Sequence, residues 1–411
     1  MLLGKSKIDI TPSNPVLLAG FAHRKTPTND VIKKIFVRTF MLKNHNEIFL
    51  FIIADLIWWD DDFVVQLKKE IVKELHITEE QICFHATHNH SGPQTSAKFS
   101  QYLGDIDKEY PSFLKRKVML SIREAEQNQE EVTMEIGKGM SNVGIYRRKI
   151  VNKKVNMLPN TDILTDNELT TITFNTANKE KKAIWIHYTC HPTTTDANIL
   201  SSEFTGICCE KLEKSYDNCT VAFLQGFCGD VRPNLVSDNE FYRGSIEDMK
   251  NMGDSFSKDV FRVIESGKKY CDRESLSFNK IEIPIYFSDK QISHLAPDFL
   301  KSEWIEMVEG NKRSGYYLTI QYIEIGENLS FMACNAELVQ AYSFYARSIK
   351  KSVLPLGYSN GMVGYIPTEE QLANGGYESL DSIFYFGYPS TIAIDMEKKI
   401  KKMFKLIMEG K

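Results

Sequence analysis

The sequence predicts an α/β fold of mixed β-sheets flanked by helices, on the strength of three observations. Apolar runs typical of buried strands alternate with amphipathic segments typical of helices over most of the 411 residues. Polar residues directly follow several of the apolar runs, which places candidate functional side chains at strand ends. Neither internal repeats nor low-complexity linkers interrupt the pattern. We therefore expect one domain spanning residues 1–411.

The predicted elements follow from the amino terminus. A strand-like segment opens the chain and ends by the turn residues Thr11 and Pro12. The apolar run 48–54 ends in Asp55, which suits a buried strand. Apolar residues then recur every four positions from Phe63 to Leu75, as in a helix. Further strands are predicted at 82–86, 132–136, 170–174, 183–187, 221–225, 281–287, 317–325 and 329–333, and helices at about 110–125 and within 204–215, 245–266, 336–350 and 391–408. Residues 268–316 show weak periodicity apart from one strand, so a boundary or insertion could lie there.

The composition argues against two classes of partner. A formal net charge of −4 gives no electrostatic reason to expect nucleic acid or an anionic membrane surface. No run of 18 apolar residues is present, so no membrane span is predicted. No signal peptide is readable, and we expect a cytoplasmic protein whose eight cysteines are reduced and mostly buried. A zinc site at the adjacent Cys208 and Cys209 is a minor alternative.

The first chemical motif runs from His85 to Pro93 and places three of the nine histidines within six positions. If the preceding apolar residues form a strand, His88 and His90 point to one side of the sheet edge, where the strand gives way to a loop. Imidazole is the commonest metal ligand and titrates near neutral pH. The motif therefore indicates a metal or catalytic site, with a purely structural turn as the alternative.

A second histidine pair, His187 and His191, has the i, i+4 spacing of a metal-binding helix. The apolar run 183–187 instead predicts a strand, and Pro192 disfavours a helical conformation at His191. We therefore expect His191 in a loop at a strand end, matching His88. His187 is expected to be a core or supporting histidine.

A third motif follows the strand predicted at 221–225. Gly226 and Gly229 would allow the backbone to approach a ligand closely. Asp230 and Arg232 are candidates for ligand binding, although an ion pair between these two residues is an equal alternative.

Together, these motifs resemble the catalytic domain of the neutral (alkaline, non-lysosomal) ceramidase family. The shared features, in order, are Thr87-His88-Asn89-His90-Ser91-Gly92-Pro93, His191-Pro192-Thr193, Gln225-Gly226 with Gly229-Asp230-Val231, and a late glutamate-tyrosine set. The opening residues are similar as well: Gly4-Lys5, Asp9-Ile10-Thr11-Pro12, Gly20 and Val37-Arg38. The resemblance extends to about residue 390 and implies that domain's fold and the hydrolysis of an N-acyl bond with Zn²⁺ as cofactor.

Carried over residue by residue, the resemblance implies a zinc ion held by His88, His191, Glu337 and Tyr365. Such a ligand set leaves the ion a net charge of about +1 and room for water, the pattern of a catalytic site. Without the resemblance, Glu337 is an ordinary glutamate in the first turn of a helix, and Tyr365 is a packing residue after a glycine turn.

The resemblance also assigns residues to the substrate. His90 and Tyr377 would face the substrate carbonyl and stabilise the oxyanion. Arg147 would line the pocket, although Arg148 aligns equally well. Asp230 is expected to orient a ligand or to take part in proton transfer, and Asp55 to fix a histidine tautomer.

Two departures from the family pattern bear on the substrate. Arg232 stands where the ceramidases carry a serine in Gly-Asp-x-Ser-Pro, so a serine-centred step cannot be transferred. The sequence of 411 residues also leads us to expect a catalytic domain alone, lacking the carboxy-terminal β-sandwich domain of full-length ceramidases. Arginine suits a carboxylate or phosphate, so we expect a small, polar acylated substrate.

The leading hypothesis is a zinc-dependent amidohydrolase that acts on such a substrate through a metal-activated water. One alternative is an esterase or lactonase using the same zinc site. The other is a ligand-binding member of the family that has lost activity.

Overall fold

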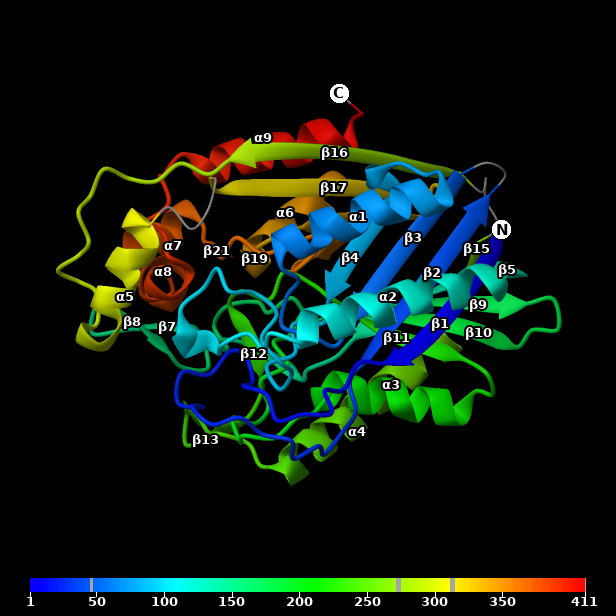
Figure 1. Cartoon of the computed structure of the whole chain (residues 1–411), viewed down its shortest axis with the longest axis horizontal. Coiled ribbons are helices and arrows are strands. Elements are labelled where there is room, and N and C mark those ends of the chain that lie inside the picture. The colour runs from blue at the N-terminus through cyan, green and yellow to red at the C-terminus, as the bar shows by residue number, and fades with distance from the viewer. Residues whose placement is uncertain (45–46, 271–274, 311–314, 411) are drawn as a thin grey trace.

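The structure is a computed structural model that describes residues 1–44, 47–270, 275–310 and 315–410. Two β-sheets pack face to face, and helices cover the outer face of each sheet (Figure 1). This architecture confirms the predicted fold class of mixed sheets flanked by helices.

The larger sheet is mixed and runs in the order β11-β10-β9-β5-β1-β2-β3-β4, with β15 also paired to β5. Its strands are β1 (Leu2–Asp9), β2 (Phe36–Asn44), β3 (Glu47–Ala54), β4 (Ile82–Ala86), β5 (Glu130–Met140), β9 (Glu168–Thr176), β10 (Lys181–Tyr188), β11 (Thr220–Gln225) and β15 (Lys268–Tyr270). Each edge strand is parallel to its neighbour: β4 pairs with β3 and β11 with β10. The carboxyl ends of these four strands therefore provide the loops in which sites usually lie.

The smaller sheet runs in the order β16-β17-β18-β20 and packs on one face of the larger one. Its strands are β16 (Leu276–Pro284), β17 (Tyr317–Ile325), β18 (Leu329–Cys334) and β20 (Val353–Leu356). Short pairs join β6 (Gly144–Tyr146) to β12 (Val231–Pro233), β7 (Arg148–Val151) to β8 (Lys154–Met157), β13 (Val236–Ser237) to β14 (Glu240–Phe241), and β19 (Glu337–Leu338) to β21 (Tyr365–Ile366).

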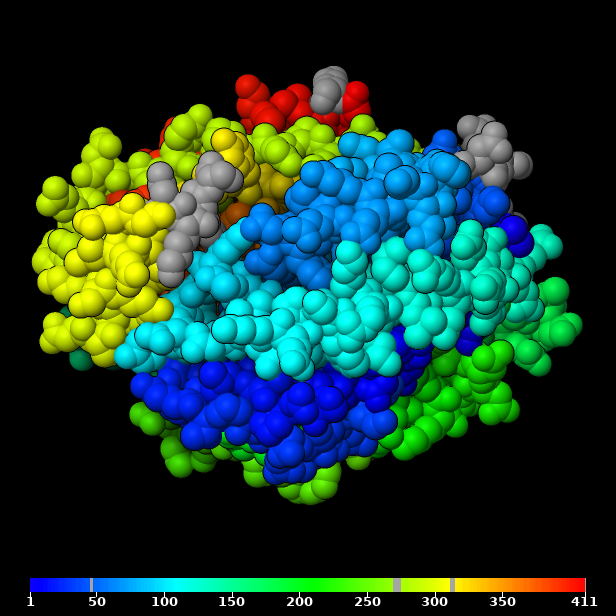
Figure 2. Space-filling view, viewed as in Figure 1, coloured from blue at the N-terminus to red at the C-terminus, as the bar shows by residue number. Residues whose placement is uncertain are grey.

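The helices occupy the outer layers. They are α1 (Asp61–Leu75), α2 (Tyr110–Gln127), α3 (Glu203–Ser215), α4 (Ile246–Glu265), α5 (Asp298–Glu309), α6 (Gln340–Ile349), α7 (Glu369–Asn374), α8 (Ile383–Phe386) and α9 (Met396–Met408), with the 3₁₀ turns η1 (Glu79–Gln81) and η2 (Gln101–Leu103) and the π-helical turn η3 (Tyr377–Asp381). In Figure 1, α1 and α2 cross in front of the larger sheet and α9 lies along β16. The space-filling view shows α1, α2, α5 and the N-terminal segment closing this face (Figure 2).

The alternation of side chains along β3 explains the layered core. Phe49, Phe51 and Ile53 face the smaller sheet, where they join the cluster that contains Phe331. The intervening residues of β3 face the helices, because successive side chains of a strand point to opposite faces. All of these side chains are fully buried, which accounts for the continuous apolar run in the sequence.

Most predicted elements are present, and the differences have local causes. The strand predicted at 281–287 lies at Leu276–Pro284. The prediction placed its end too late, because alternating apolar residues continue past Pro284 although the chain leaves the sheet there. The weakly periodic region 268–316 contains helix α5, which the sequence pattern did not show. The helix expected within 336–350 begins at Gln340, so Glu337 precedes it on β19.

Two expectations about composition can be compared with the described residues. Seven cysteines are buried and free of disulfides, and Cys271 lies outside the described part of the chain. The group of potential ligands found among the described residues consists of histidines and includes neither Cys208 nor Cys209. None of the helices in the described ranges is long and apolar enough to cross a membrane.

Candidate metal centre

The histidines of the first two motifs lie in loops that leave the ends of β4 and β10. β4 ends at Ala86 and β10 at Tyr188, so His88, His90 and His191 follow strand ends, as predicted. His88 adopts a left-handed backbone conformation with φ of 62°. For a residue other than glycine this conformation costs free energy, so the surrounding contacts hold it in place.

The two motifs meet because the edge strands β4 and β11 of the larger sheet approach each other. The backbone N–H of Gln225, the last residue of β11, donates to His85 Nε2 on β4 at 2.9 Å. The side chain of Gln225 then donates to the carbonyls of Thr87 and Cys190, at 3.2 and 2.7 Å. The glutamine therefore ties together the loops that carry His88 and His191.

Backbone carbonyls orient two of the imidazoles. His88 Nδ1 donates to the carbonyl of Ile57 and His191 Nδ1 to that of Val231, each at 2.9 Å. A nitrogen that faces a carbonyl oxygen must carry the proton, so Nε2 of each ring carries a lone pair. This is the tautomer that metal-binding histidines need.

Glu337 reaches these nitrogens from β19, whose parallel pairing with β21 sets Glu337 opposite Tyr365. Its Oε2 atom lies 3.5 Å from His88 Nε2 and 3.3 Å from His191 Nε2. The alternative of a helix-terminal glutamate is wrong, because α6 begins three residues later and the carboxylate is only 2% exposed.

The third histidine gives a second, overlapping donor set. His90 Nε2 is 3.1 Å from His88 Nε2, and the ligand atoms of His88, His90 and His191 all lie within 4.8 Å of one another. His88 and His191 therefore belong to both sets, and the third donor is either Glu337 or His90.

This donor set fits a divalent cation on electrostatic grounds. Burial, followed by the charge of Arg147, lowers the pKa of His191 to about 4. His191 Nε2 is buried and makes no hydrogen bond within the described ranges. Two lone pairs thus face a carboxylate, and a cation between them would remove the repulsion.

Tyr358, which sequence reasoning missed, supports this cluster from behind. Its ring stacks on His88, with centroids 3.7 Å apart and planes 15° apart. Its hydroxyl donates to Glu337 Oε2 at 3.3 Å and lies 3.0 Å from Cys228 Sγ. Tyr358 follows β20 and has φ of 53°, an unfavourable backbone conformation for a residue other than glycine. No sequence signal marks this conformation, so the residue could be recognised only from coordinates.

His90 is held by the N-terminal segment. A Cβ atom on Gly20, which has φ of +94°, would lie 2.2 Å from His90 Nδ1, so only glycine fits against the ring. Arg24 donates to the carbonyl of His90, and Phe21 packs edge-on against the imidazole at 5.4 Å. Burial and the neighbouring imidazoles lower the pKa of His90 well below its usual value, which keeps the ring neutral.

Arg147 joins the two predicted tyrosines. It donates through Nη2 to the Tyr365 hydroxyl at 3.1 Å and through Nε to Glu378 Oε1 at 2.8 Å. Its guanidinium also lies over the ring of Tyr377, 5.6 Å from the centroid. Arg148, the alternative that the sequence left open, instead pairs with the other oxygen of Glu378 and donates to the carbonyl of Gly375.

A cavity of about 160 Å³ opens beside these residues. Arg147, Tyr377, Glu378 and Met157 are among its lining residues. Burial, together with Glu337, raises the pKa of Tyr377, so its hydroxyl remains a hydrogen-bond donor at neutral pH. Glu378 was not predicted, because a single glutamate after Tyr377 gives no sequence signal for a partner 231 positions away.

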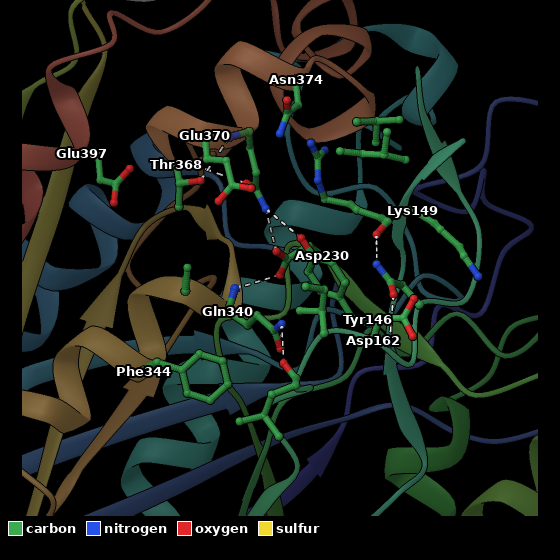
Figure 3. Close-up of a pocket in the computed structure, with 18 of the residues that line it drawn as sticks. Tyr146, Lys149, Asp162, Asp230, Gln340, Phe344, Thr368, Glu370, Asn374 and Glu397 are labelled. Atoms are coloured by element: carbon green, nitrogen blue, oxygen red, sulfur yellow. Dashed lines mark hydrogen bonds between the residues drawn. The ribbon is translucent and has the colours of Figure 1, made fainter. Parts of the chain in front are cut away.

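Asp230 faces a different cavity, of about 730 Å³ (Figure 3). Its carboxylate accepts from the Gln340 backbone N–H and from Gln371 Nε2, both at 2.8 Å. Burial raises the pKa of Asp230 to about 6. The suggested ion pair between Asp230 and Arg232 is wrong, because both carboxylate oxygens are engaged by the glutamines.

Asp55 and the remaining motif histidines have structural partners. Asp55 accepts twice from Arg38 Nη1 at 2.9 Å, so the expectation that it fixes a histidine tautomer is wrong; backbone carbonyls do this instead. His187 donates from Nε2 to the Pro355 carbonyl at 2.7 Å, which confirms it as a core histidine. His85 is likewise buried between Gln225 and Ser359.

Comparison with known proteins places this arrangement in a family. The family model for the N-terminal region of neutral/alkaline non-lysosomal ceramidase matches residues 1–254. Two solved structures share the fold at a TM-score of 0.78 and 16% sequence identity: the neutral ceramidase from Pseudomonas aeruginosa and a ceramidase complexed with C2. Each covers 99% of this chain, which in turn covers 74% and 75% of theirs. No curated protein matches.

Proposed function

Because this chain belongs to the neutral/alkaline non-lysosomal ceramidase family, we propose that it is a zinc-dependent hydrolase that cleaves the amide bond of a small, polar acylated substrate. Water adds to the acyl carbon, the C–N bond breaks, and the amine leaves with a proton. His88, His191, Glu337 and Tyr365 would hold the Zn²⁺, His90 and Tyr377 would act on the carbonyl, and Arg147 and Arg232 would bind the substrate.

One observation carries the proposal: the Nε2 lone pairs of His88 and His191 converge on one oxygen of Glu337. The Tyr358 hydroxyl donates to that oxygen but to neither imidazole, so two lone pairs still face a carboxylate, which is unfavourable unless a cation joins them. The predicted fourth ligand, Tyr365, stands beside Glu337 through the β19–β21 pairing. Burial and the Glu337 carboxylate raise the pKa of the Tyr365 phenol, and Arg147 donates to its hydroxyl oxygen.

A bound zinc ion would supply Lewis acidity, polarising an acyl oxygen and lowering the pKa of water towards about 7. The chain's own residues would then stabilise charge on the carbonyl oxygen. His90, kept neutral by burial, and Tyr377, kept protonated, would be the donors. One well-placed donor of this kind contributes about 3 kcal/mol to the stability of the transition state.

Arg147 would position this machinery. Its ion pair with Glu378 fixes the guanidinium between Tyr365 and Tyr377, so both phenols keep their orientation in the absence of substrate. Pre-organised donors of this type cost little reorganisation during the reaction. Asp230 would orient a ligand or transfer a proton in the 730 Å³ cavity. Its carboxylate lines that cavity together with its partners Gln340 and Gln371.

We further propose that residues 1–411 form one catalytic domain that works in the cytoplasm. A core cluster that includes residues from Ile10 to Ile407 supports the first part. The buried, unpaired cysteine thiols support the second, since such thiols persist under reducing conditions.

The test combines metal analysis with paired substrates. The purified protein is expected to contain one zinc ion per chain and to hydrolyse an N-acyl amide faster than the ester with the same acyl group. His88→Ala should lose both the metal and the activity. His294→Ala, which removes an exposed histidine far from the cluster in sequence, is the matched control and should keep both.

Three results would overturn the proposal in whole or in part. Full activity in His88→Ala would show that the histidine cluster is not the active site. Stoichiometric zinc without turnover of either substrate would favour a ligand-binding protein, and faster ester cleavage would identify an esterase or lactonase.

A further inference from the structure

Among the described residues, Arg232 is a buried cation that forms no ion pair with an acidic side chain. The residue is 7% exposed, and its Nε is buried with no hydrogen bond in the described structure. Its recorded contacts are the ring of Phe241, 4.3 Å from the guanidinium carbon to the ring centroid, and the sulfur of Met157, 3.8 Å from Nη1. Neither contact supplies the oxygen acceptors that a guanidinium needs.

The other buried arginines in the described ranges differ in this respect. Arg38 binds the carboxylate of Asp55, and Arg147 and Arg148 share that of Glu378. Arg24 donates to three backbone carbonyls. Leaving a buried charge unpaired is strongly unfavourable, so the isolation of Arg232 needs an explanation.

The surroundings of Arg232 make its positive charge still less favourable. Burial, followed by the charges of Arg147 and Arg243, lowers the pKa of Arg232 to about 10. The carboxylate of Asp196, which also acts on Arg232, already lies 3.5 Å from Arg243 Nε. An anion bound at this point would therefore be attracted by more than one cation.

Two neighbours of Arg232 connect it to the proposed active site. The residue before it, Val231, accepts from His191 Nδ1, so β12 carries both the support of a predicted ligand and the arginine. Met157, which contacts Arg232, lines the 160 Å³ cavity together with Arg147 and Tyr377. Methionine is flexible and unbranched, so Met157 can yield to a ligand.

We propose that Arg232 is an anion subsite and that the substrate carries an oxyanion, either a carboxylate or a phosphate, which the guanidinium binds. The proposal rests on the proposed amide hydrolysis and names the chemical class of its substrate. An arginine at this point would select for a charged group rather than add to the chemistry. The bound oxyanion would supply the acceptors that Nε and the terminal nitrogens lack.

The kinetic test uses matched substrates that differ only in charge. An N-acylglycine is compared with its glycinamide, and an N-acylethanolamine phosphate with the unphosphorylated amide; the pair that shows the larger preference identifies the anion. We expect kcat/KM to favour one anionic member by roughly 30-fold, the range of a charge-assisted hydrogen bond. In Arg232→Ser this ratio should fall close to one, and in Arg232→Lys it should be intermediate.

Arg123→Ser is the control, because Arg123 is an exposed arginine paired with Glu74 on the helical face and should keep the wild-type ratio. Serine is smaller than arginine and removes a buried, unpaired charge, which favours folding of the variant. Equal turnover of charged and neutral substrates by the wild type, or an unchanged ratio in Arg232→Ser, would overturn the subsite while leaving amide hydrolysis intact.

A binding measurement separates this proposal from the reaction. Inorganic phosphate and acetate are titrated calorimetrically into the zinc-containing wild type, Arg232→Ser and Arg123→Ser. We expect the preferred anion to bind at least about 10-fold more weakly to Arg232→Ser than to the other two proteins. If this holds but no amide is cleaved, the subsite stands and the proposed function fails. Equal affinity in all three proteins would refute the subsite.

Discussion

The strand histidines and the loop histidines of the two motifs show how one residue type takes two roles. His85 and His187 lie within β4 and β10, whereas His88, His90 and His191 lie in the loops that follow. His90 is half-buried and the other four are buried, so burial does not distinguish His88 and His191 from the strand histidines. The two groups differ in what the ring nitrogens face.

On the strands, the ring nitrogens that form hydrogen bonds do so with backbone or hydroxyl groups, and His187 Nδ1 forms none within the described ranges. His85 Nε2 accepts from Gln225 N–H, and Nδ1 lies 2.9 Å from Ser359 Oγ, so both nitrogens are satisfied within the core. In the loops, Nδ1 of His88 and His191 is satisfied by a carbonyl while Nε2 faces Glu337. A histidine can therefore bind a metal only where its fold orients one nitrogen and leaves the other facing further donors.

The largest expected effect separates His191 from His187. His191→Ala should reduce zinc content from one ion per chain to almost none and lower kcat/KM by at least about 10³-fold, because the site loses a donor of the proposed metal. His187→Ala should keep its zinc. Metal analysis and kinetics of the two purified variants test this, and retention of zinc by His191→Ala would remove it from the ligand set.

The next effect concerns stability. His85→Ala leaves Gln225 N–H without an acceptor and creates a cavity, so the free energy of unfolding should fall by about 3 kcal/mol. Urea denaturation followed by circular dichroism measures this change. Zinc stoichiometry should stay at one; its loss from a folded variant would mean that the strand histidine also belongs to the metal centre.

The pH dependence of stability tests the neutral strand histidines. Burial, followed by Arg347, lowers the pKa of His187 from 6.5 to about 4 in the folded protein. The contribution of the neutral His187 ring to stability is fully present above pH 6.5 and is lost as the pH falls towards 4. The reason is that His187 in the unfolded chain binds a proton at a higher pH than His187 in the folded protein, which favours unfolding. The loss is about 2 kcal/mol at pH 5.

Unfolding measured at pH 7 and pH 5 should therefore show a smaller acid-induced loss in His187→Gln than in the wild type. His294→Gln, at an exposed position, should behave like the wild type. An identical pH response in His187→Gln would show that the folded protein does not suppress protonation of this ring.

The smallest expected effect concerns the support of the loop histidines. Tyr358→Phe keeps the ring that stacks on His88 and removes the hydroxyl that donates to Glu337. We expect zinc affinity to fall by about 10-fold, as for other groups that orient metal ligands. Competition with a chromogenic chelator measures it, with Tyr345→Phe as the control because that hydroxyl bonds to Lys401. No change would leave Tyr358 as a packing residue.

Local sequence patterns determined the elements that carry the histidines. The apolar runs ending near Ala86 and His187, together with Pro192, correctly predicted that His88 and His191 follow strand ends. These inferences succeed because alternation, apolar runs and proline report on the backbone within a few residues. The predicted ligand and substrate roles, including those of Tyr365 and Arg232, came from resemblance to the family and stay predictions, as does the single domain.

Tertiary structure alone decided which side chains meet. The approach of edge strands β4 and β11 joins the two histidine loops through Gln225, and the β19–β21 pairing delivers Glu337 to them. The same packing pairs Asp55 with Arg38 and places Asp230 in the lining of another cavity. The hydrogen-bonded partners among these residues lie from 17 to 140 positions apart and leave no mark on local periodicity, because their contact depends on how the sheets close and pack.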